Sequence, residues 1–283
     1  MKKYFLIFGS LIMMAFSTGC QKKIELGKNA SFTIEKNVSY GEEDPQQKMD
    51  IYIPQNGSKG DVFIIIHGGG WRGGERSGLT SFTFDLMKKF PNHTFVNMDY
   101  RLASTKRFAL PNQMDDIKNA ILKVEKKLNY QPKYILLGNS AGGSLSMLYA
   151  YKFDQDKKVK AVVNIVGPAD LSDPGFKNYD NYSFLEKHLI DPKIIDKNIS
   201  SMNFGSPTHW ITATSTPTIS FYGTQDEVVP MSQKKILDST MDKNKVYHES
   251  YEFNGNHLSW EEKSHSIFLI NKISNFLKNV DKK

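Results

Sequence analysis

The chain contains one cysteine, Cys20, among its 283 residues. A lone cysteine cannot close an internal disulfide, so the fold must be stabilised by a core and not by crosslinks. The apolar stretch near the start, residues 4–16, is too short to span a bilayer. Hydrophobic residues make up 39% and charged residues 24% of the chain, which indicates a globular domain with one sizeable core.

A block of basic residues is also absent. The net charge is +7, but the lysines are scattered among polar residues, as in Lys157-Lys158. Because no zinc knuckle or RNA-binding aromatic motif accompanies them, we expect a solvated surface and no nucleic-acid partner. A basic surface can still favour contact with anionic membrane lipids.

The first twenty residues have the features of an export signal. Two lysines precede the apolar stretch, and the small residues 17–19 lead to Cys20. This ending resembles a bacterial lipobox, in which the cysteine is acylated, although Ser17 stands where leucine is usual. We therefore expect an exported, membrane-anchored lipoprotein, periplasmic or at the cell surface, with residues 21–29 as a polar tether. The alternative is ordinary signal cleavage beside an incidental cysteine.

Strand-like and helix-like segments alternate over residues 30–283. Val62–Ile66 is a continuous apolar run, typical of a strand buried on both faces, and Asn112–Leu128 has apolar residues at helical spacing. Other predicted strands cover residues 32–38, 49–53, 94–98, 134–137, 161–166, 218–222 and 246–253, and other predicted helices cover residues 140–151 and 261–277. The alternation predicts an α/β fold, with a mostly parallel central sheet flanked by helices.

Residues 171–210 interrupt this alternation. They are rich in Asp, Asn, Ser and Pro, with one amphipathic piece around residues 184–190. We expect a small cap insertion there, a kind of segment that commonly carries substrate contacts.

The motif Gly138-Asn139-Ser140-Ala141-Gly142 lies between a predicted buried strand and a predicted helix. This is the context of a nucleophile elbow, in which a strained turn projects the serine hydroxyl above the sheet. The two outer glycines leave room for the turn to close. Ser140 is therefore the predicted nucleophile, and a glycine-rich turn with an incidental serine is the alternative.

A second glycine-rich turn, residues 67–71, follows another buried strand and should open at the same edge of the sheet. We predict that the main-chain N–H groups of Gly69, Gly70 and Ala141 form an oxyanion hole, which would stabilise the charge that develops when a carbonyl is attacked. A phosphate loop is disfavoured, because no Gly-Lys-Ser/Thr follows the glycines and no spaced dinucleotide fingerprint is present.

Two side chains of the same turn have predicted roles. His67 is expected to hold the loop by hydrogen bonds and not to transfer protons. For Trp71 two roles stay open, lining of the acyl or alcohol pocket and packing in the core.

A serine hydroxyl becomes a good nucleophile when a base takes its proton, and that base needs a carboxylate behind it. With an elbow of this type the chain order is serine, acid, histidine. Of the seven histidines, His257 combines this order with a turn between the last predicted strand and helix. Asp226 lies in a turn after the preceding strand, and is the predicted acid; Asp170 and Asp173 are the fallback acids.

Together these motifs resemble an α/β-hydrolase of the carboxylesterase group, akin to hormone-sensitive lipase and to bacterial acetyl and feruloyl esterases. The resemblance covers most of the chain after the signal, including residues 49–54 and 67–71, the elbow, the acid turn and Asn256-His257. It implies an α/β-hydrolase fold, and it implies that Asp99, Arg101 and Asp116 form a structural polar network below the site. The sequence departs from the family after Leu102, where relatives often continue with Ala-Pro and a proline-rich loop, and its cap is short beside the large lids of lipases.

The predicted activity is hydrolysis of carboxylic esters through an acyl-enzyme, without a metal or an organic cofactor. Location and resemblance favour small-molecule or carbohydrate esters, such as acetyl or feruloyl groups on polysaccharides, as substrates. A related amidase or peptidase is one alternative, because the same machinery serves both reactions. A non-catalytic binding lipoprotein that retains the fold is the other.

Overall fold

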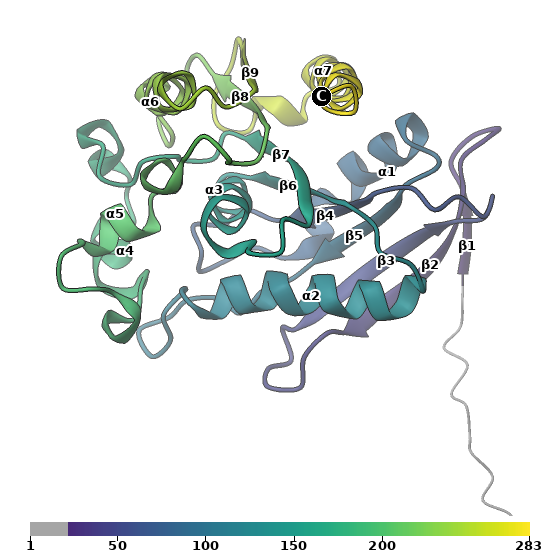
Figure 1. The fold of residues 1–283 in the computed structure, drawn as a ribbon, viewed down its shortest axis with the longest axis horizontal. Helices are drawn as coiled ribbons and strands as arrows, with labels where there is room; N and C mark the ends of the chain where they lie inside the picture. The colour runs from purple at the N-terminus through teal and green to yellow at the C-terminus, as the bar shows by residue number, and fades with distance from the viewer. Residues whose placement is uncertain (1–21) are drawn as a thin grey trace, which may run out of the picture.

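The computed structural model describes residues 22–283 (Figure 1), so the predicted export signal and Cys20 lie outside the described residues. In the described part, nine strands form one sheet in the order β1-β2-β3-β5-β4-β6-β7-β8-β9. The strands are β1 (Lys22–Glu25), β2 (Ser31–Ser39), β3 (Lys48–Pro54), β4 (Val62–Ile66), β5 (Thr94–Met98), β6 (Tyr134–Asn139), β7 (Val159–Ile165), β8 (Thr218–Gly223) and β9 (His248–Phe253). The strands from β1 to β5 pair antiparallel, and the strands from β5 to β9 pair parallel. The predicted mostly parallel sheet is confirmed.

Helices cover both faces of this sheet. The longer helices are α1 (Thr80–Lys89), α2 (Asn112–Leu128), α3 (Ala141–Leu148), α6 (Met231–Lys243) and α7 (Lys263–Val280). Residues of α1 and α7 share one apolar core with Phe63 and Ile65 of β4, whereas residues of α2, α3 and α6 share a second core with Ile64 and Ile66. In Figure 1, α1 and α2 accordingly lie on opposite sides of the strands. Because β4 has a core on each face, all five of its residues are buried.

The bounds of α2 agree with the predicted helix. Met114, Ile117, Ile121 and Val124 are buried on the side that faces the sheet. The helix ends at Asn129, whose φ of 53° lies in the left-handed region that commonly terminates helices. Within residues 22–283, no helix has both the length and the apolar character that crossing a membrane requires.

The predicted polar tether is corrected for residues 22–25. These residues form strand β1, which pairs antiparallel with β2 in a register that places Lys22 opposite Ile34. The lysines at 22 and 23 are exposed, whereas Ile24 and Leu26 pack against the core beneath α1 and α7. Burial of these apolar side chains favours a paired edge strand over a free linker.

The predicted cap lies between β7 and β8. It contains α4 (Tyr182–His188) and α5 (Ser201–Gly205), which lie at the left of Figure 1, together with short 3-10 turns. Backbone hydrogen bonds join the cap to the loop before α2, from Ala109 N–H to the His188 carbonyl at 3.1 Å and from Leu110 N–H to the Leu189 carbonyl at 2.8 Å. Leu189 is buried in the same core as α2. The cap is therefore packed on the sheet domain as part of one body.

Candidate active site

Ser140 lies in the sharp turn between β6 and α3. Its φ of 53° and ψ of −124° are strained for a residue with a side chain, and its N–H donates to the Ile165 carbonyl at 2.8 Å. A Cβ added at Gly138 would lie 2.2 Å from the carbonyl carbon of Gly142, and one added at Gly142 would lie 2.1 Å from the carbonyl oxygen of Ile66. Both positions therefore require glycine, as the sequence motif predicts.

His257 lies between Ser140 and Asp226. The Nε2 atom of His257 is 3.0 Å from the Oγ atom of Ser140, and the Nδ1 atom is 2.7 Å from the Oδ2 atom of Asp226. An ionised carboxylate only accepts hydrogen bonds, so Nδ1 carries the proton and donates it. The neutral ring then presents the lone pair of Nε2 to the serine hydroxyl. The structure brings the three predicted residues into one hydrogen-bonded row.

The carboxylate of Asp226 is held by its own turn. Its side chain is fully buried, and its Oδ1 atom accepts from the N–H groups of Val228 at 2.9 Å and Val229 at 2.8 Å. The side chain of His257 is 17% exposed, so the imidazole is held from behind and still reaches solvent. These contacts fix the orientation of the ring before any ligand binds.

The fallback acids are engaged elsewhere. Asp170 accepts from the Ser172 hydroxyl at 2.6 Å, and Asp173 accepts from the Ser232 hydroxyl at 2.5 Å and from Gln233 Nε2 at 2.9 Å. Among the described residues, neither of the two carboxylates contacts His257. They stabilise the start of the cap, and the geometry favours Asp226 as the partner of the histidine.

The glycine-rich turn of residues 67–71 lies directly beside Ser140. A Cβ added at Gly68 would be 3.1 Å from the Cβ of Ser140, and the Gly68 N–H donates to Asn139 Oδ1 at 2.9 Å. The N–H groups of Gly69 and Gly70 donate to no group within residues 22–283. The N–H of Ala141 belongs to the first turn of α3, where intrahelical acceptors are lacking. The three predicted oxyanion donors thus have no acceptor among the described residues, and their catalytic role stays a prediction.

The side chains around this turn hold it in place. His67 Nδ1 donates to the carbonyl of the next residue at 2.7 Å, and its ring stacks on Tyr100 with centroids 4.2 Å apart. The hydroxyl of Tyr100 donates to the His67 carbonyl at 3.0 Å. Burial lowers the pKa of His67, which keeps the ring neutral. The predicted loop-holding role of His67 is confirmed.

Trp71 ends the turn and is 3% exposed. Its indole belongs to the core that includes α2 and α3, and its carbonyl accepts from Gln113 Nε2 at 2.8 Å. The structure therefore shows the packing role of Trp71. The alternative role in a substrate pocket stays a prediction.

The expected polar network below the site is present in two parts. The backbone N–H and the Nε of Arg101 donate to the fully buried carboxylate of Asp116, at 2.7 and 2.9 Å, and Gln47 Nε2 donates to the same carboxylate at 2.9 Å. Asp99 lies outside this group and pairs with the guanidinium of Arg76. The Arg101–Asp116 pair anchors the segment after β5 to α2.

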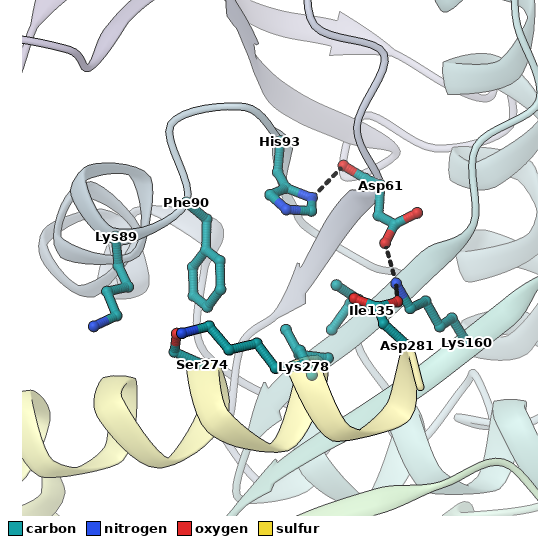
Figure 2. Close-up of a pocket in the computed structure, with 10 residues that line it drawn as sticks. Asp61, Lys89, Phe90, His93, Ile135, Lys160, Ser274, Lys278 and Asp281 are labelled. Carbon is teal, nitrogen blue, oxygen red and sulfur yellow. Dashed lines mark hydrogen bonds and ion pairs between the residues drawn. The ribbon is translucent and has the colours of Figure 1, made fainter. Parts of the chain in front are cut away.

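A cavity of about 400 Å³ lies at the opposite end of the parallel strands from Ser140, where these strands begin (Figure 2). Figure 2 shows Lys160 bonded to Asp61, at 2.6 Å, and to Asp281, while His93 Nδ1 lies 3.2 Å from the Asp61 carbonyl. These contacts tie the end of α7 to the sheet, far from the row of Ser140. In the part of the chain that the structure describes, no three His, Cys, Asp or Glu side chains are placed to hold a metal ion.

Comparison with known proteins shows the family of the chain. Residues 49–241, which include the glycine-rich turn, the elbow and the acid turn, match the BD-FAE family. The chain belongs to the BD-FAE family. The match ends before His257, so the histidine is placed by the coordinates and not by the family.

Among curated proteins, the BD-FAE chain is similar to esterase LipC of Mycobacterium tuberculosis, with 27% identity over 71% of this chain and 53% of LipC. It is also similar to kynurenine formamidase avaC of Aspergillus versicolor, with 26% identity over 38% of this chain and 43% of that protein. The chain thus spans about half the length of these curated relatives. A solved carbohydrate esterase from gut microbiota superposes with a TM-score of 0.70 and 21% identity, over 88% of this chain and 98% of the other. That match confirms the α/β-hydrolase fold.

Three residues near the site were not found from sequence. Asn139 and Gln113 fix the backbone of the glycine-rich turn, and Tyr179 of the cap places its hydroxyl against Gly70. The variable position of Gly-x-Ser-x-Gly could have indicated Asn139, because its side chain is adjacent to the nucleophile. Tyr179 and Gln113 lie in segments whose distance from the turn only the fold determines.

Proposed function

We propose that this BD-FAE protein is a serine carboxylesterase that acts through an acyl-enzyme. The observation that carries the proposal is the hydrogen-bonded row from Asp226 through His257 to Ser140. A buried carboxylate, a neutral imidazole and a strained serine in this order are what activation of a hydroxyl requires. The similarity to esterase LipC supports the same reaction class.

In the proposed reaction, Ser140 Oγ attacks the ester carbonyl carbon while His257 Nε2 takes the hydroxyl proton. The carbonyl oxygen becomes an oxyanion, which accepts from the N–H groups of Gly69, Gly70 and Ala141. Collapse of the tetrahedral intermediate breaks the bond to the alcohol, and His257 returns the proton to the leaving oxygen. Water, deprotonated by the same nitrogen, then releases the acid from Ser140. Asp226 stabilises the imidazolium in both halves of the reaction and does not itself take up a proton.

Hydrolysis of p-nitrophenyl acetate and butyrate tests the proposal. The wild type should turn over both esters and should be labelled by a fluorophosphonate, and Ser140→Ala should lose both properties. Ser144→Ala removes a hydroxyl from the helix that follows Ser140, one turn away, and should retain activity and labelling. A wild type that neither hydrolyses esters nor reacts with the probe would contradict the proposal and favour a non-catalytic binding protein that retains the fold.

For the natural substrate, we propose acetyl or feruloyl esters of carbohydrates. The family and the fold shared with a carbohydrate esterase support this substrate class. Acetylated xylan and feruloylated arabinoxylan should release acetate or ferulate when incubated with the protein. Activity confined to the small p-nitrophenyl esters would contradict the carbohydrate assignment and leave the esterase assignment intact.

Amide hydrolysis is the second candidate, favoured by the similarity to a kynurenine formamidase. The same nucleophile and oxyanion donors serve an amide, and the pocket decides between the substrates. Comparison of kcat/KM for p-nitrophenyl acetate and p-nitroacetanilide, and for N-formylkynurenine, separates the two. A ratio that favours the amides would replace the ester assignment.

We also propose that the protein is exported and held on a membrane by a lipid at Cys20. The support is the sequence of residues 2–20, with its basic start, apolar stretch and final cysteine. In a bacterial host, labelled palmitate should be incorporated into the full chain and not into Cys20→Ser. Equal release of the two proteins into the soluble fraction would contradict the anchor.

A further inference from the structure

The cap places a tyrosine against the oxyanion turn. Tyr179 follows the 3-10 turn Pro174–Asn178, and its ring stacks on Phe176 with centroids 5.4 Å apart. A Cβ added at Gly70 would lie 2.4 Å from the hydroxyl oxygen of Tyr179. With a carbon–carbon bond of about 1.5 Å, the hydroxyl is therefore within roughly 4 Å of the Gly70 Cα. Gly70 also has a φ of 59°, so both its backbone and its neighbour suit glycine.

The proton of this hydroxyl has no acceptor within residues 22–283. The oxygen accepts from Asn181 Nδ2 at 3.3 Å, and a tyrosine hydroxyl that accepts one bond can still donate another. Asn181 in turn accepts from the guanidinium of Arg72 at 3.4 Å. The Arg72 guanidinium lies 4.2 Å from the ring centroid of Phe184 in α4. Asn181 thus holds the hydroxyl, Arg72 holds Asn181, and the hydroxyl proton is left without an acceptor among the described residues.

We propose that Tyr179 donates a hydrogen bond to the ester carbonyl oxygen as that oxygen becomes negatively charged. The cap would then complete an oxyanion hole whose other donors are main-chain N–H groups, one of them from Gly70. Tyrosine hydroxyls serve as oxyanion donors in other enzymes, and a donor fixed before the reaction costs no reorganisation when charge develops. No bond to hydrogen is broken, because the tyrosine keeps its proton throughout. The inference rests on the esterase function proposed above.

Tyr179→Phe tests the hydroxyl alone, because the phenyl ring can keep its stacking on Phe176. Loss of one oxyanion donor typically lowers kcat by about 10². We expect kcat to fall by a factor of that order, with KM nearly unchanged. The factor should be the same for p-nitrophenyl acetate and p-nitrophenyl butyrate, and the rate of phosphonylation of Ser140 should fall by the same factor. The matched control is Tyr182→Phe, which removes another cap hydroxyl that donates to the Leu171 carbonyl at 3.3 Å and should leave kcat unchanged.

Asn181→Ala adds a second readout. Removal of this amide frees the tyrosine hydroxyl to move, so kcat should fall when Asn181→Ala is made in the wild type. When it is added to Tyr179→Phe, kcat should not fall further, because the effects of two residues that act through one contact are not additive. A merely structural role of Tyr179 would lower the melting temperature or raise KM and leave kcat intact.

The outcomes are distinct from those for the esterase itself. An active wild type together with a fully active Tyr179→Phe, or with a variant altered in KM alone, overturns the role of Tyr179 and leaves the proposed function standing. A wild type that no fluorophosphonate labels and that hydrolyses no ester overturns both.

Discussion

Replacement of Asp226 by asparagine tests whether the carboxylate determines the state of His257. The amide has nearly the same shape, so its oxygen can still accept from the N–H groups of Val228 and Val229, at the 2.9 and 2.8 Å seen for the carboxylate. The NH₂ group then faces His257 Nδ1 across the 2.7 Å now spanned by a hydrogen bond. Two donors cannot bond to each other, so the ring must move its proton to Nε2.

A proton on Nε2 abolishes the general base. Nε2 would donate to Ser140 Oγ across the present 3.0 Å contact and could not accept the hydroxyl proton. The same change in serine proteases lowers kcat about 10⁴-fold, which corresponds to about 5.4 kcal/mol of activation free energy. We expect a loss of this size for Asp226→Asn with p-nitrophenyl acetate at neutral pH, and little change in the unfolding transition followed by circular dichroism.

Asp173→Asn provides the matched control. Asp173 is also buried, and its bonds to Ser232 and Gln233 make no contact with the histidine. We expect its kcat to stay close to that of the wild type. A folded Asp226→Asn whose kcat stays within tenfold of the wild-type kcat would refute the assignment of the acid.

Three further predictions concern the framework. Gly142→Ala should abolish soluble, active protein, because the added methyl would lie 2.1 Å from the Ile66 carbonyl oxygen; expression and a thermal melt check this. Asp116→Ala should lower the free energy of unfolding in urea by about 3–5 kcal/mol, since it leaves the buried Arg101 guanidinium with only the exposed carboxylate of Glu43 as an ionic partner. Glu249 is partly buried, which raises its pKa, but hydrogen bonds from two tyrosine hydroxyls outweigh burial and lower the pKa below its usual value. The stability that ionised Glu249 contributes is complete above its pKa in the unfolded chain and is lost as the pH falls through its lowered pKa in the folded protein. The difference in melting temperature between wild type and Glu249→Gln should therefore shrink below about pH 4.

Most of the sheet and the central row of the site could be predicted because their signals are local. Val62–Ile66 is apolar throughout since both of its faces are buried, and Gly138 and Gly142 are required by the turn around Ser140 itself. His257 and Asp226 could be chosen because each lies in a turn directly after a strand of a parallel sheet. The carboxyl ends of such strands meet at one edge, so order along the chain implied proximity in space.

The helices α1 and α6 were not predicted, and their buried faces explain why. Thr83 of α1 is buried with its hydroxyl on the side chain of Asn97, and Gln233 of α6 is buried while it bonds to Asp173. A polar residue on the inner face breaks the apolar periodicity on which the prediction depends. Strand β1 was missed because it has one apolar residue, Ile24, which is only partly buried and follows two exposed lysines.

The sequence by itself determined most of the sheet and the elbow, because backbone geometry demands apolar runs and glycines at those positions. It also determined the other two residues of the row, because each lies in a turn directly after a strand. Only the tertiary structure decided that the indole of Trp71 packs in the core, that Asp173 bonds to Ser232 and Gln233 of α6, and that Tyr179 reaches Gly70. These contacts join segments 59 or more residues apart or depend on which way a side chain turns. No local pattern encodes such distances, because they result from the packing of the cap on the sheet domain.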